Sequence, residues 1–339
     1  MSRSRVTRRQ FLATASVGTA SALKAGKAAP YTYAAKDAGT PAILGGKPVR
    51  TAPFPKWPIW GDADEQMILP VLRSGVWSRE KVVAKAEKAF AQHMGSKYCV
   101  TTTNGTNALI TALHALGVGG GDEGGAILGE DEKTIGLCYS FHNLGRPAGR
   151  FMSREKGGHP ILGSKCRMAE YQASILLSQI EHVDSQTKRR SENADYLTSR
   201  IKEIPGIVPR SDYAETTRTA YYYCGFRYKK DLFDGLTREK FVAALSAEGI
   251  PCSSGIGVIE GKPTHQEGVI ETTLNSKTFQ KIYSKGRLDE YREQNRCPVS
   301  AQLRPETVGF HGRVLLGTKQ DMDDICSAIV KIYEKRAEL

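Results

Sequence analysis

The sequence predicts an α/β protein made of two unequal units, a larger N-terminal α/β unit and a small α+β unit at the C-terminus. The chain has 339 residues, which is enough for two domains. A strand, a turn and the start of a helix follow one another between Tyr98 and Leu116. A long amphipathic helix that begins at Arg167 is of the kind that joins domains. Hydrophobic residues make up 40% of the chain and charged residues 25%, as in ordinary globular proteins.

Residues 1–40 are predicted to be a targeting signal and a linker. Arginines crowd the first nine residues, and the pair Arg8-Arg9 stands just before Phe11-Leu12. A mildly apolar stretch of small residues then ends at Ala22. We therefore expect export by the twin-arginine route, with a disordered basic tail as the alternative. No run of eighteen apolar residues occurs, so we expect no stable membrane span.

The formal net charge of +12 indicates one of two things. Either the surface binds polyanions, or arginines and lysines meet small phosphorylated molecules. We expect no nucleic-acid partner, because the positive residues are spread over the predicted helices and no nucleic-acid motif with interleaved aromatic residues occurs. Seven scattered cysteines form no CxxC pair, which predicts neither a disulfide framework nor a zinc site. No metal ligands are assigned.

The segment Ile43–Trp60 contains too many prolines for a helix or a central strand. We expect an extended arm laid over another surface, and a second subunit is one candidate for that surface. The next two segments, Asp62–Ser74 and Lys81–His93, are predicted helices. The second of them places its apolar residues on one face.

The clearest chemical feature is a predicted anion-binding cup. The run Val100–Thr103 indicates a strand, Asn104-Gly105 a turn, and Thr106 the start of a helix with apolar residues at three- and four-residue spacing. The free N–H groups of a first helical turn, the positive end of the helix dipole and the Thr106 hydroxyl suit a phosphate. Gly105 permits close approach of the ligand. The alternative is an ordinary helix with Asn104 or Thr106 as its cap.

A glycine-rich loop over residues 117–125 does not stand between a strand and a helix in the usual order, so we do not interpret it as a phosphate-binding loop. A short apolar run at 126–128 and a helix from 130 to about 143 follow. After the long helix, the expected elements are a strand-like segment at 220–228, a helix at 238–248, an irregular stretch at 253–284, a strand-like segment at 312–316 and a closing helix at 320–337.

Several motifs occur in the order that is typical of one enzyme family. They are Leu44–Arg50, Gly75–Ser78, Thr103–Leu109, Glu123–Leu128, Arg167–Ala173 and Glu248–Ser253. From Ile43 to the C-terminal helix, the chain resembles the DegT/StrS sugar aminotransferases. The resemblance implies the fold type I architecture of pyridoxal 5'-phosphate (PLP) enzymes and a homodimer. It also implies transfer of an amino group from glutamate or glutamine to a keto-sugar, usually a nucleotide sugar or a cyclitol.

The resemblance further implies four groups around the cofactor: a lysine that forms a Schiff base, an aspartate at the pyridine nitrogen, a stacking aromatic ring and a phosphate cup. Only the cup is present, and it implies that Asn104, Gly105 and Thr106 bind the PLP phosphate. Lys165 stands where the family has an asparagine that reaches the cofactor phosphate of the neighbouring subunit. Lys165 is either a charged replacement for that asparagine or a solvated loop lysine.

The segment that would carry the other three groups is missing. Gly121-Asp-Glu123 joins directly to Gly124-Gly-Ala-Ile-Leu128, although the family has several βα units of about 30 residues each in between. No remaining lysine matches the Schiff-base position, so no catalytic residue is assigned. We therefore predict an inactive family member. The alternative is a non-catalytic phosphate or sugar-nucleotide binder, or a dimerising protein.

The predicted organisation follows from this deletion. A truncated PLP-binding unit covers residues 41–165, an interdomain helix 166–204, and a small α+β domain 205–339. A doubly wound sheet without its middle strands exposes apolar strand edges and loses helical cover. We therefore expect an incomplete mixed sheet that is poorly packed or rearranged.

Overall fold

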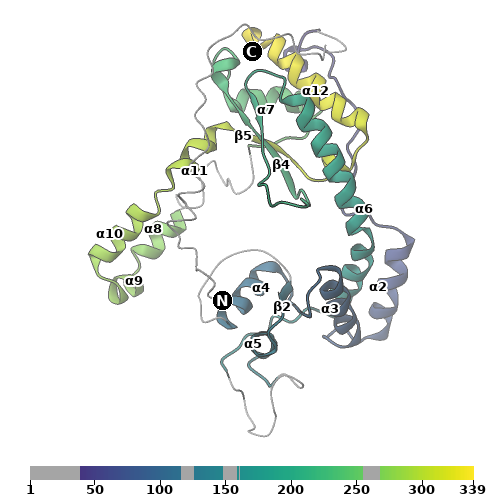
Figure 1. The fold of residues 1–339 in the computed structure, drawn as a ribbon, viewed down its shortest axis with the longest axis vertical. Helices are drawn as coiled ribbons and strands as arrows, with labels where there is room; N and C mark the ends of the chain where they lie inside the picture. The colour runs from purple at the N-terminus through teal and green to yellow at the C-terminus, as the bar shows by residue number, and fades with distance from the viewer. Residues whose placement is uncertain (1–38, 116–125, 148–158, 160, 255–267) are drawn as a thin grey trace.

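The computed structural model describes residues 39–115, 126–147, 159, 161–254 and 268–339 (Figure 1). Its helices are α2 (Asp62–Ser74), α3 (Lys81–His93), α4 (Gly105–Ala115), α5 (Glu132–His142), α6 (Glu170–Ile201), α7 (Arg238–Ala247), α8 (Gly268–Leu274), α9 (Lys277–Ile282), α10 (Lys285–Gln294), α11 (Pro298–Leu303) and α12 (Lys319–Glu334). Its strands are β1 (Tyr98–Thr101), β2 (Ala126–Gly129), β3 (Ile207–Pro209), β4 (Tyr223–Tyr228) and β5 (Thr307–His311). The predicted twin-arginine leader, the glycine-rich loop and the predicted junction near residues 121–124 lie outside the described residues.

Helix α6 connects two units (Figure 1). It has 32 residues, so it is about 48 Å long at a rise of 1.5 Å per residue. Its N-terminal half packs against α2 and α3, where Ala173 and Leu177 are buried. Its C-terminal half buries Ala194 and Leu197 in the core of the other unit. The long helix predicted from the sequence is thus confirmed. Neither α6 nor any other described helix combines the length and the apolar character that a bilayer crossing requires.

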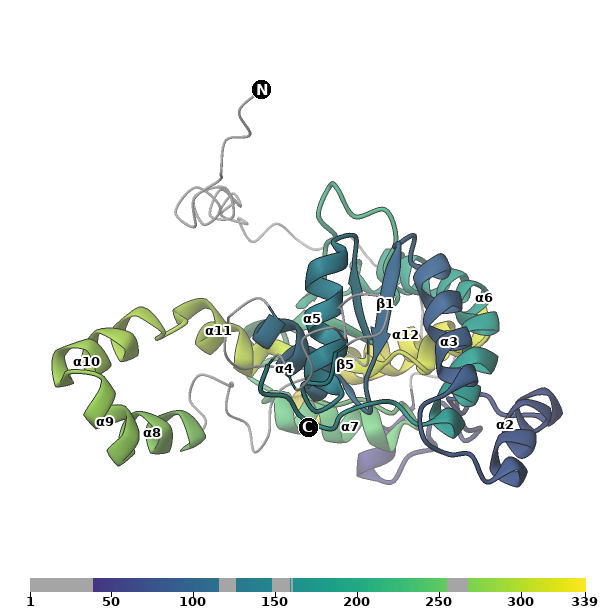
Figure 2. The same cartoon turned by 90° about the horizontal axis from the view of Figure 1, so that it is seen from below.

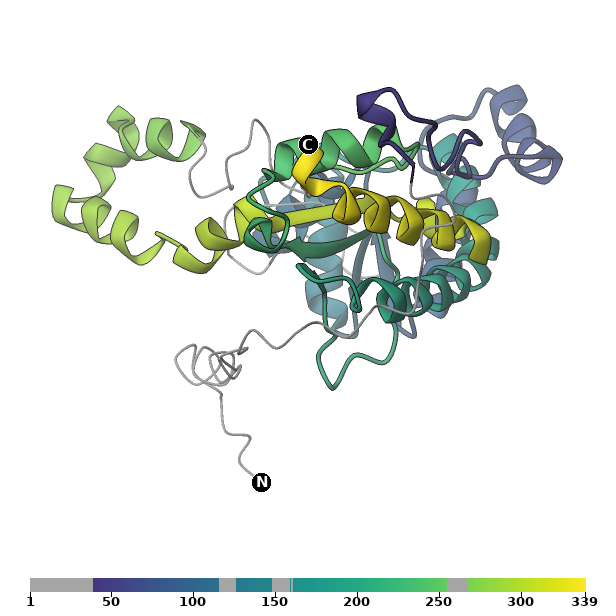
Figure 3. The ribbon, with the colours of Figure 1, turned by 90° about the horizontal axis from the view of Figure 1, so that it is seen from above.

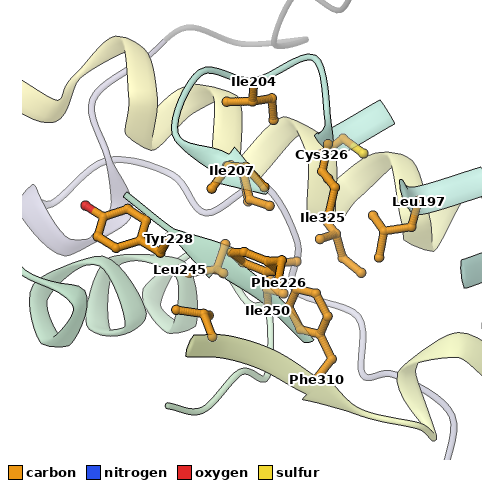
Figure 4. Packing of buried hydrophobic residues seen from close by; sticks show 14 of the residues in the cluster. Leu197, Ile204, Ile207, Phe226, Tyr228, Leu245, Ile250, Phe310, Ile325 and Cys326 are labelled. Carbon is orange, nitrogen blue, oxygen red and sulfur yellow. The ribbon is translucent and has the colours of Figure 1, made fainter. Parts of the chain in front are cut away.

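The main hydrophobic core lies in the C-terminal unit. The antiparallel sheet has the strand order β3-β4-β5, and alternate residues of β4, Cys224, Phe226 and Tyr228, are buried. Figure 4 shows Phe226 close to Phe310 of β5, with Ile325 of α12 in the same cluster. Helices α7 and α12 lie next to each other (Figure 3) and complete the core. The C-terminal unit therefore has a core of its own.

The N-terminal unit contains only a two-stranded sheet among the described residues. Strands β1 and β2 pair antiparallel, with Cys99 opposite Leu128. Three of the four β1 residues are buried, but every β2 residue is only half-buried. A small cluster joins Val100 to Ile135 and Cys138 of α5. The prediction of an incomplete sheet is confirmed, and the partial exposure of β2 agrees with the expected loss of cover.

The region between β4 and β5 differs most from the sequence prediction. The stretch 253–284 is expected to be irregular, but α8 and α9 form within it, and α10 and α11 follow. The Ser276 and Ser284 hydroxyls cap α9 and α10, at 3.3 and 3.2 Å from the N–H groups that they accept. These helices project from the body of the molecule (Figure 2). They bury few apolar residues, mainly Leu274 and Leu288, so they lack the periodicity on which a sequence prediction depends.

The last strand lies earlier in the chain than the sequence predicts. The strand-like segment at 312–316 is wrong, because β5 covers Thr307–His311 and Val314–Leu316 forms a 3-10 turn. Gly312 stands at the end of the strand, where an added Cβ would lie 1.8 Å from the carbonyl oxygen of Tyr221. Only glycine fits where the chain turns, and the apolar residues after it reach the core from the turn.

A buried ion pair anchors the proline-rich arm. Glu248, just after α7, is 0% exposed, and its carboxylate accepts the backbone N–H groups of Ala42 and Val49 at 2.8 and 2.9 Å. Lys331 of α12 is 2% exposed. Its ammonium donates to the Glu248 carboxylate at 3.0 Å and to the carbonyl oxygen of Lys47 at 2.7 Å. Both charges are therefore paired and hydrogen-bonded, which burial requires.

The arm thus covers its own chain. Arg50 forms ion pairs with Asp321 and Asp324 at 2.6 and 2.8 Å, and Phe54 is buried in the main core. Within this arm, Ala42, Val49, Arg50 and Phe54 therefore pack on the C-terminal unit of the same chain, and contact of the arm with a second subunit stays a prediction. These residues were predicted to belong to the larger unit, but they pack on the C-terminal unit, because the buried Glu248 carboxylate there accepts hydrogen bonds from the Ala42 and Val49 N–H groups.

Candidate functional site

The predicted cup lies where β1 leads into α4. Asn104 is the N-cap residue: its Oδ1 accepts the N–H of Asn107 at 2.9 Å, and its carbonyl oxygen accepts that of Ala108 at 3.2 Å. Gly105 and Thr106 are the first residues of the helix, and no acidic residue occupies the first turn. The ordinary cap is therefore present. The amides of Gly105 and Thr106 stand at the positive end of the helix dipole.

The cup is open to solvent. Asn104 and Thr106 are exposed, and Gly105 is half-buried. A phosphate could reach the first-turn amides without any rearrangement. The same openness means that the described residues do not enclose the rest of a larger ligand, so the geometry supports an anion site rather than a closed pocket.

The segment around Lys165 lies beside this cup in the same chain. The carbonyl oxygen of Cys166 accepts the N–H of Thr103 at 3.0 Å, and the Cys166 sulfur lies 3.6 Å from the Thr111 hydroxyl. Lys165 itself is exposed and forms an antiparallel bridge with Asn143. The structure therefore places the backbone next to Lys165 beside Thr103, at the entrance to the cup of the same chain, and the predicted role of Lys165 toward a neighbouring subunit stays a prediction.

A buried charge network that the sequence analysis misses covers the outer edge of β1. Both η nitrogens of Arg79 donate hydrogen bonds to the Glu87 carboxylate, at 2.7 and 2.6 Å. Glu87 also accepts the Thr101 N–H at 2.8 Å and the Tyr139 hydroxyl at 2.5 Å. Burial, and then the charge of Glu87, raise the pKa of Tyr139. The only signal in the sequence was an acidic residue on the apolar face of a predicted helix.

Glu170 fastens the start of α6 to the start of α3. It is 3% exposed, and its carboxylate accepts the N–H groups of Val82 and Val83 at 2.7 and 2.9 Å. Its own N–H donates to the carbonyl oxygen of Trp77 at 3.0 Å. A carboxylate at a helix N-terminus satisfies free amides and meets the positive end of the dipole. This residue of the Arg167–Ala173 motif therefore has a structural role.

His142 at the end of α5 is a packing residue with an unusual protonation state. It is 1% exposed, and its Nδ1 donates to the carbonyl oxygen of Tyr139 at 2.7 Å. Its Nε2 has no hydrogen-bond partner among the described residues. Burial, and then the positive charge of Arg79, lower the pKa of His142 to about 4. The imidazole is thus neutral at physiological pH.

The order of the elements, the cup at the start of α4 and the motif at the start of α6 point to one family. The sequence model of the DegT/DnrJ/EryC1/StrS aminotransferase family matches residues 58–123 and 121–330. The chain belongs to this family. Its relatives of known activity are sugar or cyclitol aminotransferases, and the similar solved structures are PLP-dependent enzymes of the same α/β fold.

Three proteins illustrate what the DegT/StrS chain is similar to. An L-glutamine:scyllo-inosose aminotransferase from Streptomyces griseus is 23% identical over 425 positions, which cover 88% of this chain and 98% of the relative. The structure of 3-amino-5-hydroxybenzoic acid synthase is 20% identical with a TM-score of 0.65, and the match covers 85% of this chain and 100% of that one. An E. coli GDP-4-keto-6-deoxy-D-mannose-3-dehydratase with bound hydrated PLP is 15% identical with a TM-score of 0.60, over 84% of this chain and 100% of that one. The structural matches show the shared fold.

The family match falls into two segments that meet at residues 121–123. The alignment with the Streptomyces griseus relative has 425 positions, whereas 88% of 339 residues is about 298 residues. About 127 aligned positions of the relative, the difference between 425 and 298, therefore have no counterpart in this chain.

The described residues fit the phosphate of PLP but not the rest of the cofactor. The cup offers helix N-terminal amides, which suit a phosphate. Its described contacts come from the side chains of Asn107 and Gln172 and from the backbone of Cys166. These three hydrogen-bonding groups are neither aromatic nor acidic, so they do not provide the stacking face or the nitrogen partner that the family resemblance implies. No chemical step through PLP is therefore derived for this chain.

Proposed function

We propose that this chain descends from keto-sugar or cyclitol aminotransferases and does not itself transfer amino groups. The main observation behind this proposal is that the family model matches the chain in two segments, which meet at residues 121–123. The length of relative that faces no residue of this chain, about 127 positions, supports a deletion at that point. In the family that the chain resembles, this segment carries the lysine that binds the cofactor covalently. Without that lysine, covalent catalysis has no nucleophile.

The structure adds two supporting observations. The N-terminal unit has a two-stranded sheet among its described residues, and the cup is exposed where a catalytic site would exclude water. PLP binding in this chain is therefore proposed only as a phosphate contact at Asn104, Gly105 and Thr106, with Lys165 as a nearby positive charge. Non-catalytic binding of a phosphorylated small molecule is the second candidate function, and the solvent-accessible first turn of α4, which has no acidic residue, favours it.

Incubation of the full chain with PLP is expected to yield no lysine adduct after borohydride reduction. Peptide mass spectrometry locates any adduct, and amino transfer from glutamine to scyllo-inosose measures activity. The Streptomyces griseus relative, treated in the same way, is the positive control. A stoichiometric adduct on one lysine together with amino transfer would show that the chain is active. Thermal protection by inorganic phosphate without an adduct would favour the binding role.

We also propose that the chain forms a homodimer through the surface around α2. Trp77 follows α2 and is 55% exposed, and its indole N–H donates to the carbonyl oxygen of Leu72 at 3.1 Å. Leu69, Leu72 and Val76 are 36%, 39% and 45% exposed on and just after the same helix. Exposed apolar residues grouped in this way mark protein contacts.

Substitution of Val76 by glutamate is expected to dissociate this homodimer in sedimentation experiments. Glutamate introduces a charge in the middle of the apolar surface, which an interface core disfavours. The matched control is Val299→Glu, because Val299 is 66% exposed on α11, far from α2 in the fold. A monomeric wild-type chain, or a Val76→Glu variant that remains dimeric, would contradict the proposal.

A further inference from the structure

The backbone groups of β1 show which edge of the N-terminal sheet is open. The Thr101 N–H donates to the Glu87 carboxylate at 2.8 Å, and the Cys99 carbonyl oxygen accepts the Tyr139 hydroxyl at 3.3 Å. Both groups therefore point away from β2. Backbone N–H and C=O groups alternate sides along a strand, so those of Val100, between these two residues, point toward β2.

The same alternation fixes the direction of the backbone groups on β2. Val100 lies opposite Ile127, so the N–H and C=O of Ile127 point toward β1. Those of Ala126 and Leu128 then point to the outer edge. None of these four outward groups has a hydrogen-bond partner among the residues that the structure describes. The strand is half-buried along its length and contains neither a charged residue nor a proline.

The other strand edges in the described part of the chain are protected. The Glu87 and Tyr139 side chains cover the outer edge of β1. On the outer side of β5, the Gly309 N–H and carbonyl oxygen exchange hydrogen bonds with Ser253, at 3.1 and 3.0 Å. At the opposite edge of that sheet, β3 has three residues and ends in Pro209, which has no N–H to donate. Cover, short length and proline all discourage pairing with another strand, and the outer edge of β2 lacks all three.

We propose that the outer edge of β2 pairs with the same edge of a second copy of this chain, about a twofold axis perpendicular to the sheet. Such an axis makes the two strands antiparallel. With Ile127 on the axis, Ala126 of each copy lies opposite Leu128 of the other, and the two residues exchange both hydrogen bonds. All four outward groups of each copy are then satisfied. The Ile127 side chains meet on the face that α5 covers.

The charges that follow β2 favour this antiparallel arrangement. Glu130, Asp131 and Glu132 come directly after the strand. In the antiparallel pair, each Glu130 lies three residues beyond Ile127, in opposite directions, so the two are about 20 Å apart at about 3.3 Å per residue. Salt screens charges beyond about 10 Å at 0.1 M. A parallel pair in register would instead place the acidic residues of the two copies side by side, which is destabilising.

The pairing is separate from the proposed contact around α2. Residues 126–128 form a small interface, so the association is weak and is populated only at high protein concentration. The homodimer through α2 is measured in dilute solution, where the β2 pairing is absent. The pairing also does not depend on whether the chain transfers amino groups, so the two proposals can fail separately.

Disulfide trapping with diamide tests the pairing in a chain that carries Val76→Glu and Cys297→Ser. These changes remove the proposed α2 contact and the native cysteine that is exposed. Ile127→Cys in this chain is expected to give a disulfide-linked dimer, and peptide mass spectrometry identifies the link between the two residues 127. Residues opposite each other in a non-hydrogen-bonded pair have Cα atoms about 4.5 Å apart, which a disulfide spans.

The matched control is Val208→Cys in the same chain. Val208 is the middle residue of β3, the protected edge strand, and it is 42% exposed. It is expected to give at least about tenfold less linked dimer, because Pro209 and the short strand disfavour pairing. The linked fraction of Ile127→Cys is expected to rise with protein concentration, as a contact between two copies requires.

Leu128→Pro, added to Ile127→Cys, is expected to lower the linked fraction to the level of the Val208→Cys control. Proline removes an outward N–H, so the copies lose half of their hydrogen bonds while β1 keeps all of its own. Unchanged hydrogen exchange of α5 amides shows that the unit is still folded, and Ala126→Pro repeats the test at the other outward N–H. The proposal is overturned if Ile127→Cys links no more than the control, if the link joins residue 127 to a different cysteine, or if folded proline variants link as before.

Discussion

Replacement of Glu248 by alanine is expected to lower the free energy of unfolding of the C-terminal unit by about 3–5 kcal/mol. The substitution leaves the Lys331 ammonium buried without its carboxylate, in a site where it is 2% exposed. It also removes the acceptor of the Ala42 and Val49 N–H groups. Unpaired buried charges and unsatisfied buried donors are among the few causes of losses of this size.

Urea-dependent hydrogen exchange of α12 amides measures this loss, because it reports the C-terminal unit alone. Glu338→Ala is the matched control: it breaks the exposed pair with Lys335 at 3.0 Å and is expected to leave the exchange unchanged. The double variant Glu248→Gln with Lys331→Met removes both charges and should recover part of the loss. An equal loss in the control and in Glu248→Ala would contradict the anchoring role of the ion pair.

Acidification from pH 7 to about pH 4 is expected to destabilise the N-terminal unit by about 3 kcal/mol through His142 alone. The folded pKa is about 4, compared with an ordinary value of 6.5. Above pH 6.5 the ring is neutral in both the folded and the unfolded state, so it has no effect. Between 6.5 and 4 the unfolded state takes up a proton that the folded state does not, and stability falls through that window.

Hydrogen exchange of α5 amides across this pH range measures the effect, and His142→Asn removes the titrating group while keeping a nitrogen donor near Nδ1. The difference between the two stability profiles isolates His142 from His311, whose pKa is also lowered. The pKa values of Asp64 and Asp131 are lowered from their ordinary value of 3.8, so their titration changes the stability mainly below that pH. Parallel profiles for the variant and the wild type would show that His142 does not titrate as described.

Apolar periodicity and capping residues predicted the helices before and after β1. Both predicted helices before the cup, Asp62–Ser74 and Lys81–His93, are confirmed to the residue. The start of α4 was predicted within one residue, and the cap by Asn104 was one of the two readings that the sequence allowed. Apolar periodicity and capping residues are properties of a few neighbouring positions, so they can be read before the fold is known.

Contacts between distant residues could not be predicted in this way. Glu248 accepts a hydrogen bond from Ala42, 206 positions away. The sequence around Ala42 does not indicate that Glu248 is its partner, and the sequence around Glu248 does not indicate Ala42. Glu87 and Arg79 form a buried pair, but Arg79 precedes the predicted helix, and an acidic residue on an apolar helix face does not by itself identify its partner. The interest in Lys165 came from the family resemblance alone, since a loop lysine has no periodicity to place it, and its role toward the cofactor phosphate of a neighbouring subunit stays a prediction.

The described residues form three hydrophobic clusters that remain separate, and the large one is built from the C-terminal unit, the C-terminal half of α6 and Phe54 of the arm. Bodies with separate cores and one shared helix do not melt as a single cooperative species. The N-terminal half of α6 can unfold while its C-terminal half is still packed in the main core. A single transition midpoint for the whole chain would then average two separate unfolding transitions. The C-terminal unit, which holds the large cluster, is therefore expected to stay folded under conditions in which the N-terminal unit opens.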